Sequence, residues 1–134
     1  MGRKIAALCL LAVMAMTLLA SCGEKAEAYT GQKNVNFSFD EPFIANVSDE
    51  PRQYVKCAIM LEISDEKLLE ELTAKQHRIR GFVYDLIGAR TNEQVRDIAE
   101  KSTILAEFIA LANAEFNTDA IVAAYFTEFT PVRQ

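Results

Sequence analysis

The sequence predicts an α+β domain in which an antiparallel-type sheet carries its helices on one face. Three observations support this prediction. Residues 54–63 alternate in character with a period of two, which is typical of a strand with one buried face. Several amphipathic helical patterns follow, and residues 121–130 are rich in β-branched and aromatic residues. The two long strands are therefore distant in sequence and have to pair non-locally.

The N-terminus has the order of parts of a secretory signal peptide. Two basic residues precede an uncharged run at 5–20, which Leu-Ala-Ser closes directly before Cys22. At about 1.5 Å per residue this run reaches about 24 Å as a helix, less than a hydrocarbon core of about 30 Å. The tetrapeptide resembles the bacterial lipobox, which implies cleavage before Cys22 and lipidation of that cysteine. We expect residues 1–21 to be a lipoprotein signal peptide; an uncleaved transmembrane helix is the alternative.

The charge and the cysteine content of the chain limit which classes of partner it can bind and whether it can form disulfides. The chain has 14 basic and 19 acidic residues, and loss of Arg3 and Lys4 with the signal leaves 12 against 19. Such an acidic chain is a poor partner for nucleic acid or anionic lipid, because both favour clustered Lys and Arg. With Cys9 in the signal and Cys22 lipidated, Cys57 has no disulfide partner. We therefore expect Cys57 to be buried.

The first half of the mature chain combines a tether with short strands. Residues 22–40 are expected to form a flexible tether, and 41–134 the folded domain. Residues 37–39 and 43–47 have the character of short extended pieces. The following strand places five alternate residues in the core; these are Val55, Cys57, Ile59, Leu61 and Ile63.

Helices follow this strand. Ser64 and Asp65 can cap the first helix, and Thr73 with Gln76 forms a plausible capping box for the second. The apolar stripe of the second helix repeats at the helical spacing; its members are Ile79, Phe82, Val83, Leu86 and Ile87. Gly88 is expected to end this helix in the left-handed conformation.

The last part of the chain predicts a short helix, a long helix and a strand. Thr91 and Gln94 make a second capping box, with Val95, Ile98 and Ala99 placed inside the short helix. The long helix is expected from about residue 102 to 116. The last strand, 121–130, should alternate strictly and end at Pro131. Its two faces are Ile121/Ala123/Tyr125/Thr127/Phe129 and Val122/Ala124/Phe126/Glu128/Thr130.

Residues that could carry catalysis or bind a metal have simpler explanations. His77 is the only histidine, which excludes a two-histidine metal site, and it lies on the polar side of its helix. Asp65, Glu66, Glu70 and Glu71 fit a solvated first half of a helix, where negative charge is favourable and Lys67 can pair with Glu71. Phosphate loops, nucleophile elbows and zinc-protease motifs are not found. We predict no catalytic, cofactor or metal residues, and a protein that is not an enzyme.

Four segments, in their order and spacing, resemble the periplasmic domain of the flagellar basal-body protein FliL. They are Glu41–Val47, Arg52–Glu62, Arg78–Ile87 and Ala124–Phe129. The resemblance implies a stomatin/prohibitin-like α+β fold and a non-enzymatic assembly protein. Proteins of this family lie beside the motor stators, associate with MotA, MotB and basal-body ring components, and form homo-oligomeric rings. The residues carried over as assembly positions are Arg80, Asp85, Tyr125, Phe126, Thr127, Glu128 and Phe129.

The chain departs from the FliL pattern at its anchor. The family normally keeps an uncleaved transmembrane helix, whereas this chain has a short signal and a lipobox. Gly81 also replaces a common Asp, and Pro131 interrupts the usual apolar ending. The leading hypothesis is a lipid-anchored periplasmic protein that assembles beside the stators and supports motility. The alternative is an envelope lipoprotein, an adaptor or small-ligand-binding module unrelated to flagella. Gly23 resembles outer-membrane sorting, so either membrane is open.

Overall fold

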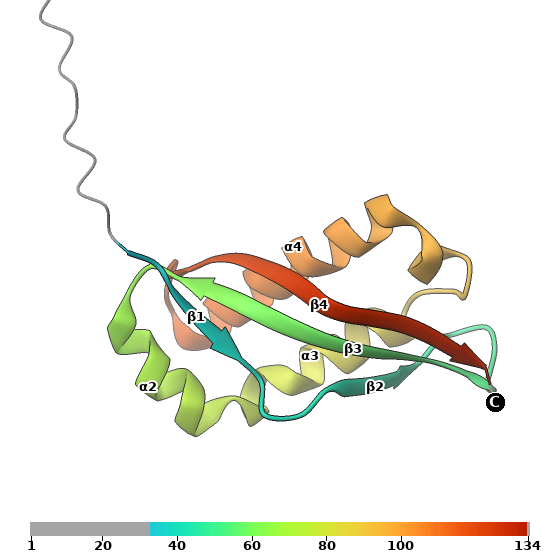
Figure 1. Cartoon of the computed structure of the whole chain (residues 1–134), viewed down its shortest axis with the longest axis horizontal. Coiled ribbons are helices and arrows are strands. Elements are labelled where there is room, and N and C mark those ends of the chain that lie inside the picture. The colour runs from blue at the N-terminus through green and yellow to red at the C-terminus, as the bar shows by residue number, and fades with distance from the viewer. Residues whose placement is uncertain (1–32, 134) are drawn as a thin grey trace, which may run out of the picture. The chain divides into compact units, whose positions relative to one another are not determined.

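The computed structural model describes residues 33–133, and four strands and three α-helices lie within this range (Figure 1). The strands are β1 (Val35–Ser38), β2 (Phe43–Asn46), β3 (Gln53–Ile63) and β4 (Ile121–Arg133). Between β3 and β4 come α2 (Glu66–Lys75), α3 (His77–Gly88), the 3-10 helix η1 (Gln94–Arg96) and α4 (Ile98–Phe116). This order confirms the α+β prediction.

Strand β3 is the centre of an antiparallel sheet. Strand β4 pairs with it along its whole length, from Gln53 opposite Arg133 to Ile63 opposite Ile121. On the other side of β3, β1 pairs with residues 60–63 and β2 with residues 54–57. Strands β1 and β2 therefore follow one another along one edge, and β4 forms the opposite edge. The non-local pairing predicted for the two long strands is confirmed.

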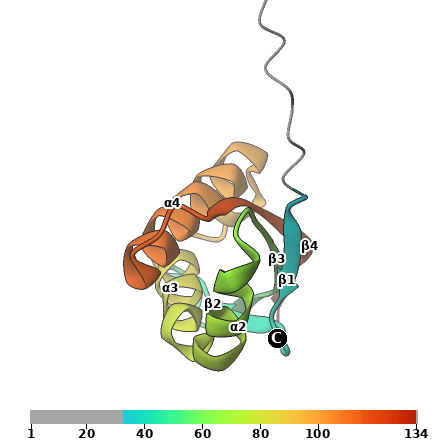
Figure 2. The same ribbon diagram turned by 90° about the vertical axis from the view of Figure 1, so that its left-hand side faces the viewer.

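The helices pack on one face of this sheet, as Figure 2 shows in the view along the strands. Every second residue of β3 is buried on that face, including Cys57, which is fully buried as expected. Burial and the nearby charge of Glu128 raise the pKa of the Cys57 thiol to about 12. The helices contribute a further set of buried residues to this core: Leu72, Ile79, Val83, Ile87, Ile104 and Phe108. Each such side chain contributes about 1.5–3 kcal/mol by leaving water.

The strict alternation predicted for the last strand is wrong, because β4 contains two register shifts. Opposite Glu62 and Ile63 the pairing passes over Val122, and opposite Ala58 and Ile59 it passes over Thr127. Each extra residue is a β-bulge, which changes the face that the following residues occupy. The core side of β4 is consequently made by residues with uneven spacing: Ile121, Ala124, Phe126 and Phe129.

Both predicted ends of the sheet also need correction. Phe37 in β1 is buried and packs edge-to-face on Phe39, so residues 35–40 belong to the folded domain and not to the tether predicted for 22–40. Pro131 does not end the last strand, since β4 continues to Arg133 with Pro131 opposite Val55. An edge strand tolerates proline because one side of it needs no N–H donor.

The helix caps agree with the sequence at two places and differ at two others. Asp65 accepts a hydrogen bond from the Lys67 amide at 3.0 Å, as expected of an N-cap. Thr91 and Gln94 exchange the two hydrogen bonds of a capping box, at 2.9 and 3.2 Å. The other predicted capping box is absent from the described residues, because the Thr73 hydroxyl donates to a carbonyl one turn earlier in its own helix.

The other cap that differs is at the end of α3. Gly88 is not in the left-handed region, and the chain leaves α3 through Ala89 in the right-handed region. Helix α4 starts at Ile98 and not near 102, because Asp97 accepts a hydrogen bond from the Ala99 amide at 2.9 Å and caps it there. Ile98 is consequently 80% exposed at the helix start, and not inside a short helix as predicted.

Arg90 fastens the end of α3 to α4. Its guanidinium contacts Glu100 at 2.8 Å and Glu107 at 2.7 Å, and donates to the Leu86 carbonyl at 3.1 Å. The Arg90 carbonyl accepts a hydrogen bond from Ser48 at 2.9 Å, which adds the β2–β3 connection to the same junction. The Arg90 side chain is only 12% exposed, so these contacts are largely shielded from water.

We expect Arg90→Met to lower the free energy of unfolding by about 1–3 kcal/mol, because it leaves Glu100 and Glu107 without their shared partner. The matched control is Lys56→Met, which removes an ion pair to Glu128 whose side chains are 43% and 41% exposed. That loss should stay below about 1 kcal/mol. Urea unfolding of both variants measures the difference, and equal losses would contradict the role given to Arg90.

Gly81 offers a second test of stability. It lies inside α3, and a Cβ added there would meet no atom within 4 Å. Because glycine costs a helix interior about 1 kcal/mol relative to alanine, Gly81→Ala should raise the free energy of unfolding by about 0.5–1 kcal/mol. Ala74→Gly at an exposed position of α2 is the reverse control and should lower it by a similar amount. A destabilising Gly81→Ala would show that the helix is strained or covered there.

Candidate protein-binding surface

The residues considered for chemistry serve the fold or face solvent. Asp65 caps α2, and Glu71 pairs with Lys75 at 2.9 Å and not with Lys67 as expected. His77 is exposed at the start of α3. Over residues 33–133, no group of three or more His, Cys, Asp or Glu side chains is arranged to hold a metal ion. The candidate functional features described next are surfaces of this part of the chain.

Arg80, one of the two predicted assembly residues on α3, contacts the β1–β2 connection. Its guanidinium donates to the Glu41 carbonyl at 3.0 Å and the Pro42 carbonyl at 3.4 Å. It also lies over the Phe43 ring, 4.4 Å from the ring centre. One turn earlier, the Gln76 side chain donates to the Asp40 carboxylate at 2.7 Å. The first turns of α3 thus hold the connection between the two short strands.

Asp85, the second predicted residue on this helix, is placed differently. It is exposed, and within the described part of the chain no hydrogen bond or ion pair reaches its carboxylate. Arg78 pairs with Glu115 of α4, so the basic residues of α3 are directed to other partners. The structure therefore does not bring Arg80 and Asp85 together. Asp85 is the one of the two whose charge is available to a partner.

The five predicted residues of β4 divide between the two faces of the sheet. Phe126 and Phe129 lie on the helix side, where their rings are 4.6 Å apart and Lys101 lies over the Phe129 ring. Tyr125 and Glu128 lie on the other face, opposite Met60 and Ala58 of β3. Thr127 is the bulge residue between the two sets and is exposed.

The sheet face away from the helices is mixed in character. No helix of the described residues covers it (Figure 2). The Tyr125 hydroxyl donates to Glu62 at 3.2 Å, and this hydrogen bond to the carboxylate raises the pKa of Tyr125. Ile44 is 58% exposed on the same face and Tyr125 is 47% exposed. Aromatic side chains such as that of Tyr125 are enriched in protein-binding surfaces.

Two shallow hollows lie along α4. The first, of about 430 Å³, lies at the end of α4 and has a mainly polar lining that includes Asn113, Asn117 and Asp119. The second, of about 420 Å³, lies next to the first half of β4 and is lined by side chains of both elements: Ser102, Leu105, Ala106, Ile109, Val122, Ala123, Ala124 and Tyr125. All of these residues are uncharged and most are small or apolar, so the second hollow has neither a positive nor a negative lining.

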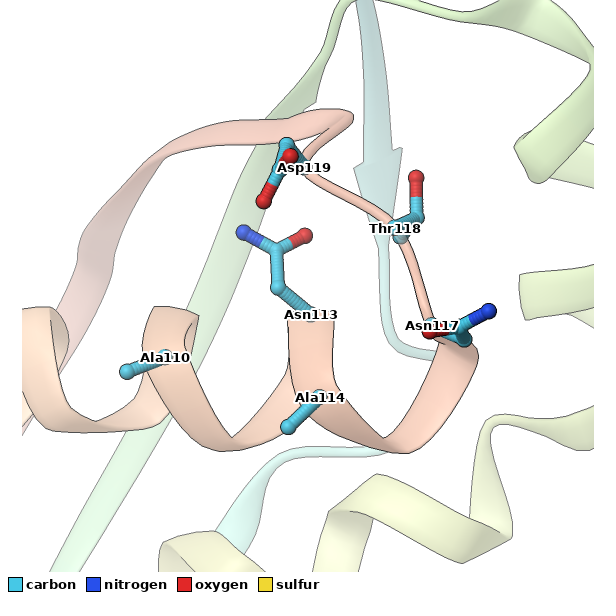
Figure 3. Close-up of a pocket in the computed structure, with 6 residues that line it drawn as sticks. All are labelled: Ala110, Asn113, Ala114, Asn117, Thr118 and Asp119. Atoms are coloured by element: carbon cyan, nitrogen blue, oxygen red, sulfur yellow. The ribbon is translucent and has the colours of Figure 1, made fainter.

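The hollow at the end of α4 is lined by Asn113, which points from the helix toward the segment leading into β4 (Figure 3). Its side-chain amide donates to the Ile121 carbonyl at 3.0 Å and accepts from the Ile121 amide at 3.1 Å. Asn117 then turns the chain with a φ of 50°, in the left-handed region that asparagine tolerates. Because both ends of the Asn113 amide are engaged, this residue positions the start of β4.

Comparison with known families identifies the domain. The model of the family described as flagellar basal body-associated protein FliL matches residues 36–130, from β1 into β4. The chain belongs to the FliL family. It is also 27% identical over 96 residues to a protein named flagellar protein FliL from Aquifex aeolicus (strain VF5). That match covers 71% of this chain and 60% of the relative, so the chain spans somewhat less than two thirds of that protein's length.

Membership confirms the resemblance found in the sequence and agrees with the expectation that the chain is not an enzyme, since FliL is a family of flagellar basal-body-associated proteins. It does not favour the alternative of an envelope adaptor unrelated to flagella. Among residues 33–133, no helix is long and apolar enough to cross a membrane. Cys22 and the predicted signal peptide, 1–21, lie outside the described residues.

The different settings of Arg80 and Asp85 lead to opposite expectations. Arg80→Ala removes two hydrogen bonds to carbonyls and the contact with Phe43, and should cost about 1–2 kcal/mol of unfolding free energy. Asp85→Ala should change it by no more than about 0.5 kcal/mol. Thermal unfolding of both variants is the measurement. A neutral Arg80→Ala with a destabilising Asp85→Ala would reverse the assignment.

Proposed function

We propose that this chain is a lipid-anchored accessory protein of the flagellar basal body that supports motility. Its periplasmic domain assembles with further copies beside the motor stators, formed by MotA and MotB, and the basal-body ring components. The observation that carries the proposal is the FliL family match, which extends over nearly all of the described sheet and its helices. The domain acts by binding, and no covalent bond is made or broken.

The binding surfaces available to such a protein are on the described domain. The open sheet face presents Tyr125 and Glu128, and α3 presents the Asp85 carboxylate, which has no ion pair within residues 33–133. Arg80 supports this surface from within, because it fixes the β1–β2 connection. The domain is acidic, so its charge favours basic segments of partner proteins over nucleic acid or anionic lipid.

The proposed anchor is a lipid on Cys22, exposed as the first residue of the mature chain when the signal peptide, 1–21, is removed. The support for this is the order of basic residues, uncharged run and lipobox at the N-terminus. A lipid chain and a membrane-spanning helix both hold a domain at a membrane, so either anchor is compatible with the same folded part.

The test is membrane fractionation together with swimming speed for Cys22→Ala. We expect the variant to accumulate as an uncleaved precursor or to leave the membrane fraction, and swimming to slow. Cys9→Ala is the matched control, because it removes a cysteine from the same N-terminal region without changing the lipobox. It should be processed and should support swimming like the original chain.

Other results separate the two parts of the proposal. A tightly embedded Cys22→Ala protein with normal swimming would mean that residues 5–20 act as a transmembrane helix. A strain lacking the protein that swims normally at low and high load would contradict the motor role, whatever the anchor is. Loss of anchoring with unchanged swimming would keep the lipoprotein and reject its contribution to motility.

A further inference from the structure

The two edges of the sheet differ in how well they are protected against additional strands. The edge made by β1 and β2 consists of two strands of four residues each, separated by residues 39–42, which include Asp40, Glu41 and Pro42. Short strands, charged residues and proline are the usual means by which an exposed edge avoids pairing with other chains. This edge is therefore a poor site for strand addition.

Strand β4 forms the other edge and is less protected over its first half than over its second. In the described residues it pairs with β3 alone. Its second half contains the bulge at Thr127, the charged Glu128 and Arg133, and Pro131, all of which discourage pairing. Its first half, residues 121–126, contains the bulge at Val122 but has no charged residue and no proline, and residues 123–126 pair regularly with β3. We call residues 121–126 the open edge segment.

Apolar surface lies directly beside the open edge segment. Val122 and Tyr125 are each 47% exposed, and the hollow of about 420 Å³ is bounded by both of them and by Leu105 and Ile109 of α4. On its outer side α4 carries mostly small residues, together with Glu107 and two large apolar side chains, Ile98 and Leu111, which are 80% and 40% exposed. A strand added to β4 would place side chains over this hollow.

The charges at the two ends of the segment indicate what kind of strand fits. Asp119 precedes it and Glu128 follows it. If two copies of this chain paired through the segment in a symmetric antiparallel register, Asp119 of one copy would lie opposite Glu128 of the other. Lys56 pairs with Glu128, but Asp119 has no such basic partner among the described residues. The Lys56–Glu128 pair is largely exposed and compensates Glu128 only in part, so Asp119 opposite Glu128 would still oppose like charges; this disfavours a second copy.

We infer that the open edge segment of β4 binds an extended segment of a different protein as an additional strand, and that this segment has an uncharged, β-branched centre with a basic residue at each end. Backbone hydrogen bonds supply affinity in this mode of recognition, and side-chain pockets supply selectivity. The inference rests on the proposed role of this domain in binding other proteins and adds the site and the chemistry of the partner.

The probe is a synthetic peptide with an alternating Val-Thr core of about six residues, long enough to cover the segment, and Lys-Arg at both ends. Its matched control has the same core with Glu-Asp ends. Binding of each fluorescent peptide to the full chain is followed by anisotropy, and amide exchange of residues 121–126 is measured with and without peptide. We expect saturable binding of the basic peptide, slower exchange in the segment, and binding of the acidic peptide weaker by about tenfold or more.

Two variants locate the site. Val122→Lys places a charge on the open edge and should weaken binding of the basic peptide by about tenfold or more. Ile44→Lys places the same charge on the exposed residue of β2 and should leave binding unchanged. Equal urea midpoints for both variants exclude unfolding as the cause. A basic peptide methylated on its backbone nitrogens should fail to bind, because it cannot donate to the edge.

Four results would overturn the inference. They are no binding of the basic peptide, equal binding of both peptides, equal effects of the two variants, and slower exchange in residues 121–126 that grows with protein concentration alone. The last result would assign the segment to a second copy. None of these measurements uses swimming. The flagellar proposal can therefore fail while the strand-binding site is confirmed, and the strand-binding site can fail while the flagellar proposal is confirmed.

Discussion

The pairing of β3 with β4 is the constraint on which the rest of the structure depends. It joins residues 53–63 to residues 121–133 and encloses all three described α-helices between them in the chain. Closing such a long connection costs chain entropy, and the cost is recovered only when the helices cover the core side of the sheet. The fully buried residues of β3 and of α3 and α4 show that this covering is complete on one face. Asn113 and Arg90 then fix the two junctions where the connection could open.

The same pairing leaves the molecule asymmetric, and the asymmetry is what makes it suited to binding. The helices cover one face of the sheet, so the opposite face and the outer edge of β4 are left uncovered by other elements of the described residues (Figure 2). Polar cross-strand pairs at Lys56 and Tyr125 let the open face remain in water. The first half of β4 has one bulge, at Val122, and none of the charged residues or the proline found in its second half. An open sheet face, together with a strand edge that has no charge or proline over residues 121–126, suits the described domain to binding.

Local pattern predicted the elements whose formation depends on neighbours in sequence. The period of two in β3, the Asp65 cap and the Thr91–Gln94 capping box are all contained within a few residues, and each is present. The faces of β4 were predicted wrongly because a bulge is set by the register against another strand and leaves no mark in the strand's own alternation. Arg90 could not be found because its partners are 10 and 17 residues away. Asn113 gave a weak signal, since asparagine is uncommon inside helices.

Arg80 and Asp85 show how a family resemblance and a structure answer different questions about one helix. The resemblance places both among the assembly positions, but it carries no information on whether a side chain acts by touching a partner or by holding the surface that does. Arg80 has its donors occupied by the β1–β2 connection, and desolvating them again for a partner would cost the contacts that order that connection. Asp85 has no such competing contact in the described residues. Binding a partner through Arg80 would therefore break contacts within the domain, whereas binding through Asp85 would not. This difference favours Asp85 and the β4 edge over Arg80 as points of contact.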